Sequence, residues 1–330
     1  MVYFEGCYLT GIHPQNPETI EKIKSYAHNR GATEEEVQAA LRRDSDYVID
    51  LQRRLDFVFI DDGQYHQDLF ERTRKSTTGM EEGSDARWFD NNTFFVRPKI
   101  TERSLDFNGG LSTFSRANGH FKTPWKVNLP SPYTFADAAQ LPSEYPKEEF
   151  LYDIARFLGE IAHTLFEGID AVHLNEPALA YHQTRKRDNS EIKCAVEAIN
   201  TLIQGAHNYN GKKNTVILHT YFGDFSNLCP EIFECKADVI GIDAIKTNFD
   251  KLSKDDFPKD KAYALGVVNS RSSIIESPGY IAGLAERAAK RIGARRVYIV
   301  PNCDLEFVTL KIAEEKMRNM AEGLRLLRGD

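Results

Sequence analysis

Three residues of types that bind zinc follow short apolar runs in the second half of the chain. His219, Asp243 and Cys303 each come at or just after the end of such a run. Imidazole, carboxylate and thiolate are the groups that zinc takes in proteins. If the runs are neighbouring parallel strands of a barrel, their carboxyl ends bring these side chains to one side of its mouth. The three together predict a metal site, whereas a single His or Cys in such a place is more often a buried structural residue.

Other strand ends carry polar groups that would face a substrate. They are Ile12 and His13 after the first run, Asp62 and Gln64 after the second, Asn175 and Glu176 after the fourth, and Asn269 and Arg271 after the seventh. Glu176 precedes a proline and fits equally well as a cap or brace of a loop. Arg271 fits a bidentate clamp on a carboxylate or phosphate, or a surface salt bridge.

The elements that must position these groups are short apolar runs that alternate with helical patterns. Strands are predicted at 3–9, 56–60, 126–129, 171–174, 215–218, 239–242, 263–268 and 297–300. Helices are predicted at 34–55, 147–166, 191–207, 227–235, 249–252, 280–292 and 310–327, the first with Thr33 and Glu36 as a capping box. Eight strand–helix units in this length favour the α/β class and a (β/α)8 TIM barrel, with residues 1–330 as one domain.

One segment does not fit the alternation. Residues 62–123 are too many for a connecting loop, and 92–99 and 100–107 are predicted to pair as a β-hairpin. An excursion of this kind after the second strand is typical of a lid or wall over the active face.

Composition excludes several classes of function. The 330 residues carry a net charge of −7, which disfavours nucleic acid as a partner. No apolar run approaches the ~20 residues that a bilayer crossing needs, so no membrane association is expected. The start of the chain lacks the pattern of an export signal, and an odd count of five cysteines argues against a disulfide framework. These features together predict a cytoplasmic protein.

Several motifs resemble one enzyme family in order and position. They are HLNEPAL at 173–179, LHTY at 218–221, VIGIDA at 239–244, LGVVN at 265–269 and VPNC at 300–303, with GIHPQ at 11–15 similar to the family's first turn and KMRNM at 316–320 similar to its last helix. The chain resembles the catalytic domain of cobalamin-independent methionine synthase, in a short single-barrel form. The likeness spans most of the barrel but not 67–123.

The resemblance implies a zinc enzyme that moves a methyl group from a methylated folate or a methylcorrinoid donor to the thiol of homocysteine, which forms methionine. Metal binding would deprotonate the thiol and fix it in place. Carried over by position, His219 and Cys303 match the family's ligands. Asp243 stands where Glu is usual, and Tyr221 stands where a Cys is usual. Tyr221 is the more serious departure, because its phenol must lose a proton to bind metal and offers hard oxygen instead of sulfur.

The resemblance also implies substrate-binding and catalytic residues. Gln64 and Asn175 stand where the family's acidic groups hold the homocysteine ammonium, and neutral amides lose that charge assistance. Asp62 and Glu176 would compensate, and Ile12 and His13 complete the expected substrate-binding set. Asn269 and Arg271 form the expected catalytic pair, although guanidinium is a poor acid and cannot replace the histidine thought to protonate the leaving amine.

Three hypotheses follow. The first is a zinc-dependent methyltransferase that acts on homocysteine. The second is a related alkyltransferase that acts on a different thiol, which suits Gln64, Asn175 and Arg271 better. The third is a metal-free barrel that binds a small anion, which Tyr221 favours.

Overall fold

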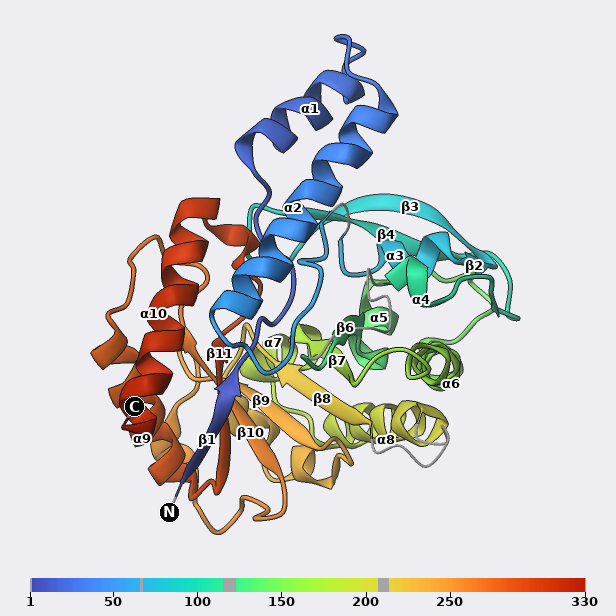
Figure 1. Cartoon of the computed structure of the whole chain (residues 1–330). Coiled ribbons are helices and arrows are strands. Elements are labelled where there is room, and N and C mark those ends of the chain that lie inside the picture. Colours follow the sequence, from blue (N-terminus) through green and yellow to red (C-terminus); the bar gives the residue numbers. More distant parts are fainter. Residues whose placement is uncertain (1, 66–67, 115–122, 207–213, 330) are drawn as a thin grey trace.

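Seven parallel strands form the central sheet of the structure, a computed structural model that describes residues 2–65, 68–114, 123–206 and 214–329. Their order is β1-β11-β10-β9-β8-β7-β6 (Figure 1). The strands are β1 (Tyr3–Cys7), β6 (Lys126–Pro130), β7 (Ala171–Glu176), β8 (Thr215–Thr220), β9 (Val239–Asp243), β10 (Ala262–Val268) and β11 (Arg296–Pro301). The predicted barrel is confirmed, and seven of its eight predicted strands lie where the apolar runs are.

The eighth position is held by an irregular segment, so the predicted strand at 56–60 is wrong. The Val58 amide donates to the Cys7 carbonyl at 3.0 Å, and Ile60 forms an isolated parallel bridge with Trp125. The segment therefore joins β1 to β6 and closes the barrel. Asp56 has a φ of 54°, which interrupts extended backbone at the point where the strand would begin.

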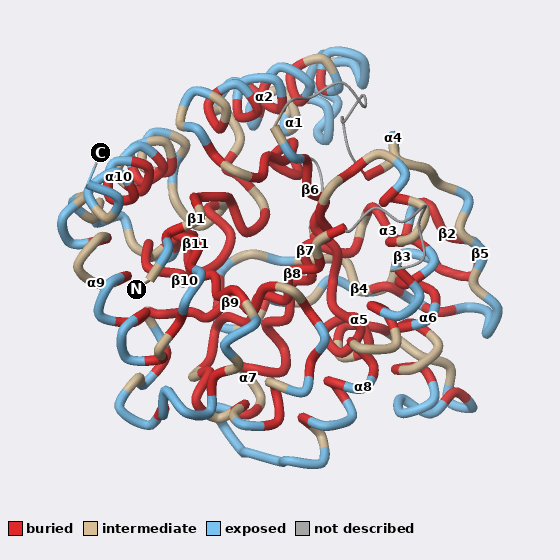
Figure 2. Tube along the Cα trace, turned by 60° about the horizontal axis from the view of Figure 1, so that its bottom comes forward, coloured by how far each residue is buried: buried red, intermediate tan, exposed pale blue. Residues whose placement is uncertain are grey.

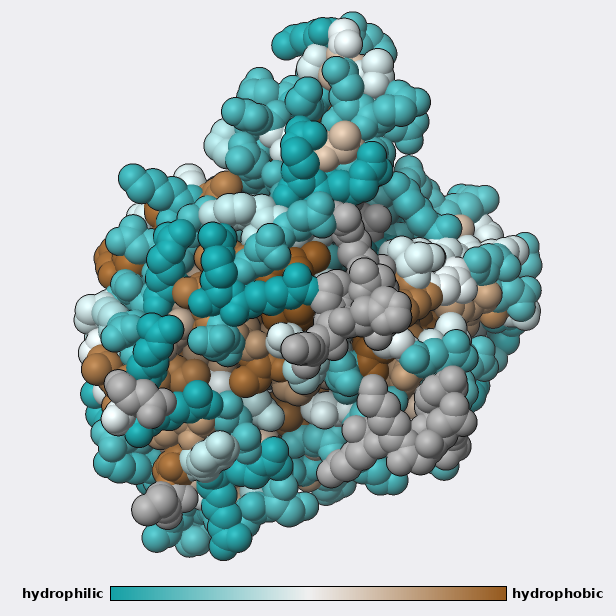
Figure 3. Space-filling view, viewed as in Figure 1, coloured by the Kyte–Doolittle hydropathy of each residue, from teal (hydrophilic) through white to brown (hydrophobic). Residues whose placement is uncertain are grey.

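Helices surround the sheet, and most of them agree with the predicted ranges. They are α1 (Pro17–Ala27), α2 (Glu34–Arg54), α5 (Pro132–Ala138), α6 (Lys147–Leu165), α7 (Pro177–Arg185), α8 (Asn189–Ala206), α9 (Pro278–Ile292) and α10 (Leu310–Arg328). The predicted capping box of α2 is present: Thr33 Oγ1 accepts from the Glu36 amide, and the Glu36 carboxylate accepts from the Thr33 amide. The first two helices project from the barrel, and their surface is largely hydrophilic in Figure 3.

Two predicted helices are replaced by short 3₁₀ turns. In place of the helix predicted at 227–235 lie η1 (Phe225–Leu228) and η2 (Glu231–Glu234), and in place of the one predicted at 249–252 lies η3 (Phe249–Lys251). A further 3₁₀ turn, η4 (Leu305–Phe307), follows β11. Pro230 interrupts the first of these stretches, because proline lacks the amide hydrogen that a continuous helix needs.

The inserted segment contains a hairpin, but with a different partner from the predicted one. It comprises α3 (Glu71–Lys75), β2 (Thr77–Thr78), β3 (Met80–Arg87), β4 (Phe94–Ile100), β5 (Asp106–Phe107) and α4 (Leu111–Phe114). The predicted pairing of 92–99 with 100–107 is wrong. The strand β4 pairs antiparallel with β3, which precedes it in the chain, and β5 pairs antiparallel with β2. The turn is closed between Trp88 and Thr93, where Phe89 adopts a φ of 51°.

Buried side chains concentrate on the strands and on the inner faces of the helices (Figure 2). One large apolar cluster lies between sheet and helices. A second, smaller cluster takes residues from β7 to β11 together with Tyr8 and Phe59, so it fills the barrel interior. Across the described ranges, none of the helices has the length and apolar character that a membrane crossing requires.

Candidate active site

The predicted metal ligand His219 lies at the end of β8 and is fully buried. Its Nε2 is 3.1 Å from the carbonyl oxygen of Asn302, and its Nδ1 has no hydrogen-bond partner in the described structure. A Cβ added to Gly241 on the neighbouring strand would lie 2.0 Å from Nδ1, so only glycine admits the ring here. Burial lowers the His219 pKa to about 4, which keeps the imidazole neutral.

The predicted ligand Asp243 is engaged by its own loop and by the strand β11. The Asn302 amide nitrogen lies 3.2 Å from both carboxylate oxygens of Asp243. One of these oxygens also accepts from the backbone amides of Ile245 and Lys246, at 3.0 and 3.1 Å. Burial raises the pKa of Asp243 to about 6. Asn302 thus bridges the elements that carry His219 and Asp243.

Cys303 is buried next to Asn302. Its sulfur lies 3.7 Å from the Asn302 side-chain oxygen, and burial, followed by the charges of Asp304 and Asp243, raises the pKa of the thiol well above its usual value. Tyr221 is also buried, with its ring centroid 5.8 Å from that of His219. Burial raises its pKa well above 10, so it is a neutral phenol. We call His219, Asp243, Asn302 and Cys303 the strand-end cluster.

The predicted zinc-binding set of His219, Asp243 and Cys303 stays a prediction. Among the residues that the structure describes, no three His, Cys, Asp or Glu side chains come together in a way that would hold a metal ion. Asn302 takes hydrogen-bonding positions on Asp243 and on the Nε2 of His219, whereas the Nδ1 of His219 has no partner in the described structure. As they stand, the described side chains do not fit a zinc ion.

Two carboxylates predicted to bind substrate, those of Glu176 and Asp62, already interact with other groups of the protein. Glu176 accepts from the Leu179 amide at 2.9 Å and from the Thr134 hydroxyl at 2.6 Å, so it caps α7. Asp62 forms a buried ion pair with Arg72 at 2.9 Å. The cap that the sequence allowed for Glu176 is therefore what the structure shows.

The predicted catalytic pair lies in the loop after β10. Asn269 Oδ1 accepts from the Arg271 amide at 3.1 Å, which makes a tight local turn. The Arg271 side chain is exposed, and its guanidinium lies 5.4 Å from the centroid of the Phe222 ring. Asn175 differs, because it is 1% exposed and neither of its amide atoms has a partner in the described structure.

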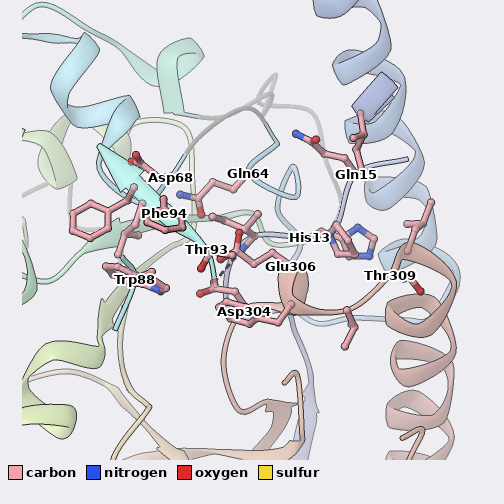
Figure 4. A pocket seen from close by; sticks show the side chains of 18 of the residues that line it. His13, Gln15, Gln64, Asp68, Trp88, Thr93, Phe94, Asp304, Glu306 and Thr309 are labelled. Carbon is pink, nitrogen blue, oxygen red and sulfur yellow. Dashed lines mark hydrogen bonds between the residues drawn. The ribbon is translucent and has the colours of Figure 1, made fainter. Parts of the chain in front are cut away.

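Ile12, His13 and Gln64 line a cavity of about 620 Å³ over the carboxyl ends of the strands, which we call the acidic cavity (Figure 4). Its walls come from the loop after β1, the hairpin β3–β4 and the loop between β11 and α10. The polar lining residues also include Asp68, Thr93, Asp304, Glu306 and Thr309, and the aromatic ones are Phe70, Trp88, Phe94, Phe95 and Phe307. Of the residues predicted to bind substrate, these three are brought together here.

Two carboxyl groups of the acidic cavity have strongly shifted pKa values. Burial raises the pKa of Asp304 to about 7. Burial, and then repulsion from Asp304 and Asp68, raises the pKa of Glu306 to about 8. Asp304 Oδ1 accepts from the Ile12 amide at 3.0 Å. Neither carboxyl group forms an ion pair with a lysine or arginine of the described chain, although the charge of Lys126 partly offsets the effect of burial on the pKa of Asp304.

Sequence reasoning did not single out Asp304, Glu306, Asp68 or Trp88. Glu306 lies in η4, between two apolar residues of the stretch Leu305-Glu306-Phe307. A charged residue within an apolar stretch just after the last strand is the signal that would have found it. Asp68 and Trp88 belong to the insertion, where no motif marks them.

Comparisons with known proteins agree with this architecture. A family model described as "Cobalamin-independent synthase, Catalytic domain" matches residues 8–324. The methionine synthase of Saccharolobus solfataricus is 28% identical over 207 residues, which are 62% of this chain and 58% of that protein. The methionine synthase of Thermococcus kodakarensis is 28% identical over 62% of this chain and 57% of its own. The matched region thus spans less than two thirds of these relatives.

A solved structure extends the likeness to the whole fold. A B12-independent methionine synthase from Shewanella sp. W3-18-1, in complex with selenomethionine, superimposes with a TM-score of 0.78 at 15% identity and covers 99% of this chain and 98% of that one. At such identity the superposition shows the shared fold alone. The family model, which covers nearly the whole chain, shows that this protein belongs to the cobalamin-independent synthase, catalytic-domain family.

Proposed function

We propose that this protein transfers a methyl group to the sulfur of a small thiol, with homocysteine as the first candidate acceptor and methionine as its product. The observation that carries the proposal is the family match over residues 8–324. The curated relatives named methionine synthase and the Shewanella protein, which binds selenomethionine, support sulfur as the acceptor atom.

The acidic cavity is where this chain's residues would bring the two reactants together. It lies over the carboxyl ends of the strands, which is the active face of barrel enzymes. Holding both reactants in a shaped cavity supplies much of the rate of a methyl transfer, because the sulfur must approach the methyl carbon in line. The buried amide of Gln64, which lines the cavity, offers a hydrogen-bonding group to the polar end of the acceptor.

A thiol other than homocysteine is the second candidate acceptor. It is favoured by Asp62 and Glu176, whose carboxylates are held by Arg72 and by the cap of α7 and so are not available to an ammonium group. A thiol without an amino group needs no such partner.

The experiment compares acceptors and donors on the purified protein. Homocysteine and 3-mercaptopropionate are each incubated with methyltetrahydrofolate or methylcobalamin, and S-methyl products are measured by mass spectrometry. Methionine from homocysteine supports the first candidate, and methylation of mercaptopropionate alone supports the second. If no donor methylates any thiol, the proposal fails.

Metal content is measured in parallel, because the family resemblance implies zinc. About one equivalent per chain, lost in Cys303→Ser, would show that the strand-end cluster rearranges to bind metal. Activity at full rate in metal-stripped protein would show that this chain works without it.

A further inference from the structure

The acidic cavity has the charge and the walls of a site for a cation. Asp68, Asp304 and Glu306 line it, and none of its described lining residues is a lysine or arginine. His13, which also lines it, is neutral at physiological pH because burial lowers its pKa to about 3. Asp68 is already held by backbone amides of Phe70, Glu71 and Val96. Asp304 accepts from the Ile12 amide, and neither Asp304 nor Glu306 forms an ion pair within the described chain. A cation in the cavity would supply a charged partner.

A second observation points to a ligand independently of the carboxyl groups. Gln64 is 2% exposed and its Oε1 has no partner in the described structure. The Nε2 of fully buried His13 and the Oγ1 of Thr93 are likewise without partners. Figure 4 shows Gln64 and Thr93 close to Asp304 and Glu306 in the middle of the cavity. Buried polar atoms in native proteins are nearly always paired, so these three indicate groups that a bound molecule would satisfy.

The third feature is the aromatic wall contributed by the insertion. Trp88 and Phe94 lie together on one side of the cavity in Figure 4. The rings of Phe70 and Phe95 pack against Trp88, with centroids 5.8 and 5.2 Å from its own. Phe94 is 63% exposed, which is unusual for so large an apolar side chain. Aromatic faces attract cations, and they attract methylated ones in particular because the methyl groups also gain apolar contact. The Arg87 guanidinium, 5.9 Å from the Phe94 centroid, already shows such a contact.

We propose that the acidic cavity binds a methylated onium group, the shared chemistry of quaternary ammonium and sulfonium compounds. A cavity lined by carboxyl groups and aromatic faces, with no lysine or arginine among its described lining residues, is suited to a permanent positive charge that carries methyl groups. The same lining disfavours polyanionic ligands, because the three carboxyl groups would repel them. A primary ammonium would gain the charge but not the apolar contact.

The use of the onium group as methyl donor rests on the proposed function. In that reaction the thiol loses its proton to solvent, and the thiolate electron pair forms the new S–C bond. The C–N or C–S bond of the onium breaks, and its electron pair leaves with a neutral amine or sulfide. Such a leaving group needs no proton donor, which agrees with Arg271, whose guanidinium is a poor acid.

The test is isothermal titration of the full chain with four probes. Choline and trimethylsulfonium carry the two onium types, 3,3-dimethylbutan-1-ol has the shape of choline without its charge, and ethanolamine has the charge without the methyl groups. We expect at least one onium probe to bind about tenfold more tightly than both controls. The probe that binds more tightly shows whether the site prefers a quaternary ammonium or a sulfonium compound. Equal affinities, or no binding of either onium, would overturn the proposal.

Substitutions then locate the site. Glu306→Gln and Phe94→Leu should each weaken onium binding by about tenfold or less without changing affinity for the neutral alcohol. Glu286→Gln is the matched control, since Glu286 is an exposed residue of α9 paired with Lys290. Unchanged onium affinity in both cavity variants would overturn the assignment. No thiol is present in this experiment, so its failure leaves the sulfur-methylation assay standing, and the converse also holds.

Discussion

The strand-end cluster and the acidic cavity both include residues at the end of β11, yet they differ in whether their buried polar groups have partners within the protein. In the strand-end cluster, Asn302 donates to Asp243 and lies against His219, so the protein itself supplies most of the partners. In the acidic cavity, the Oε1 of Gln64 and the Nε2 of His13 have no hydrogen-bond partner within the described chain. Paired polar groups rigidify a fold, and unpaired ones cost stability until a ligand binds. The cavity therefore has the properties of a binding site, and the cluster those of a structural brace.

The largest expected loss of stability comes from breaking a buried ion pair inside the barrel, where the protein supplies both partners. Lys126 is fully buried, and its ammonium lies 2.5 Å from Asp61. Lys126→Met leaves that carboxylate buried without its charge partner, which should lower the free energy of unfolding by about 3–5 kcal/mol. Urea unfolding measures the change. The matched control is Lys290→Met, which breaks an exposed pair and should cost at most about 1 kcal/mol. Similar losses in both variants would contradict the expectation.

The second effect tests Asn302 as the brace of the strand-end cluster. Asn302→Ala removes both amide contacts to Asp243 and the oxygen that accepts from the Ser270 amide at 2.9 Å. We expect a loss of about 1–3 kcal/mol in urea unfolding, because buried groups are left unsatisfied. Asn92→Ala makes the same change at an exposed turn residue and should be nearly neutral. An equally small effect at Asn302 would show that the cluster is not held by this side chain.

The third effect should have the opposite sign, because it removes an uncompensated charge from the acidic cavity. The folded-state pKa of Glu306 is raised to about 8 by burial and then by Asp304 and Asp68, so its ionisation costs stability. That cost is absent below the ordinary glutamate pKa, grows as the pH rises, and is complete above about pH 8. Glu306→Gln should therefore stabilise the protein by about 1 kcal/mol near pH 9 and by nothing near pH 4.5.

Thermal unfolding across this pH range measures the difference, with Glu286→Gln as the control. A Glu306→Gln variant that is less stable at pH 9 would mean that the carboxylate has a favourable partner. Combined with weaker onium binding, a gain in stability would place Glu306 among residues kept for binding at a cost to the fold.

Much of the barrel could be predicted from the sequence, because each buried strand is a short apolar run. The strand at 56–60 failed although four of its five residues are apolar, since only Val58 and Ile60 hydrogen-bond to the chain segments on either side. The hairpin failed because its turn at Phe89 uses a positive φ on an aromatic residue, where turn signals are normally Gly or Asn.

The candidate site was predictable only in part, for a related reason. The predicted strand ends put His219, Asp243 and Cys303 at the barrel mouth, where the structure also has them. Their contacts with Asn302 could not be predicted, because no residue type or spacing indicates its role. Gln64 and His13 were expected to face a substrate, and both line the cavity. The aromatic wall comes from an insertion without recognisable motifs, so only the folded chain brings Trp88 to this place.

The smallest expected effect concerns the support of the hairpin that forms this wall. His182 on α7 lies 3.0 Å from Asp137, and both line a smaller cavity beneath Trp88 and Phe89. The hydrogen bond to Asp137 raises the His182 pKa above its usual 6.5. The pair therefore adds stability that is fully present below that value and is lost as the pH rises through the folded-state pKa. His182→Gln should lower stability at about pH 5.5 but not at about pH 8.5, with a small difference because the ring is partly exposed.

Urea unfolding at the two pH values measures this difference, and the double variant with Asp137→Asn provides the control. If the pair is the cause, His182→Gln has no pH-dependent effect once Asp137 is neutral, since the coupling between the two side chains is then gone. A pH dependence that persists in the double variant would assign it to another group near the hairpin. Onium affinity that falls together with this stability would show that the wall must be held in place for the acidic cavity to bind its ligand.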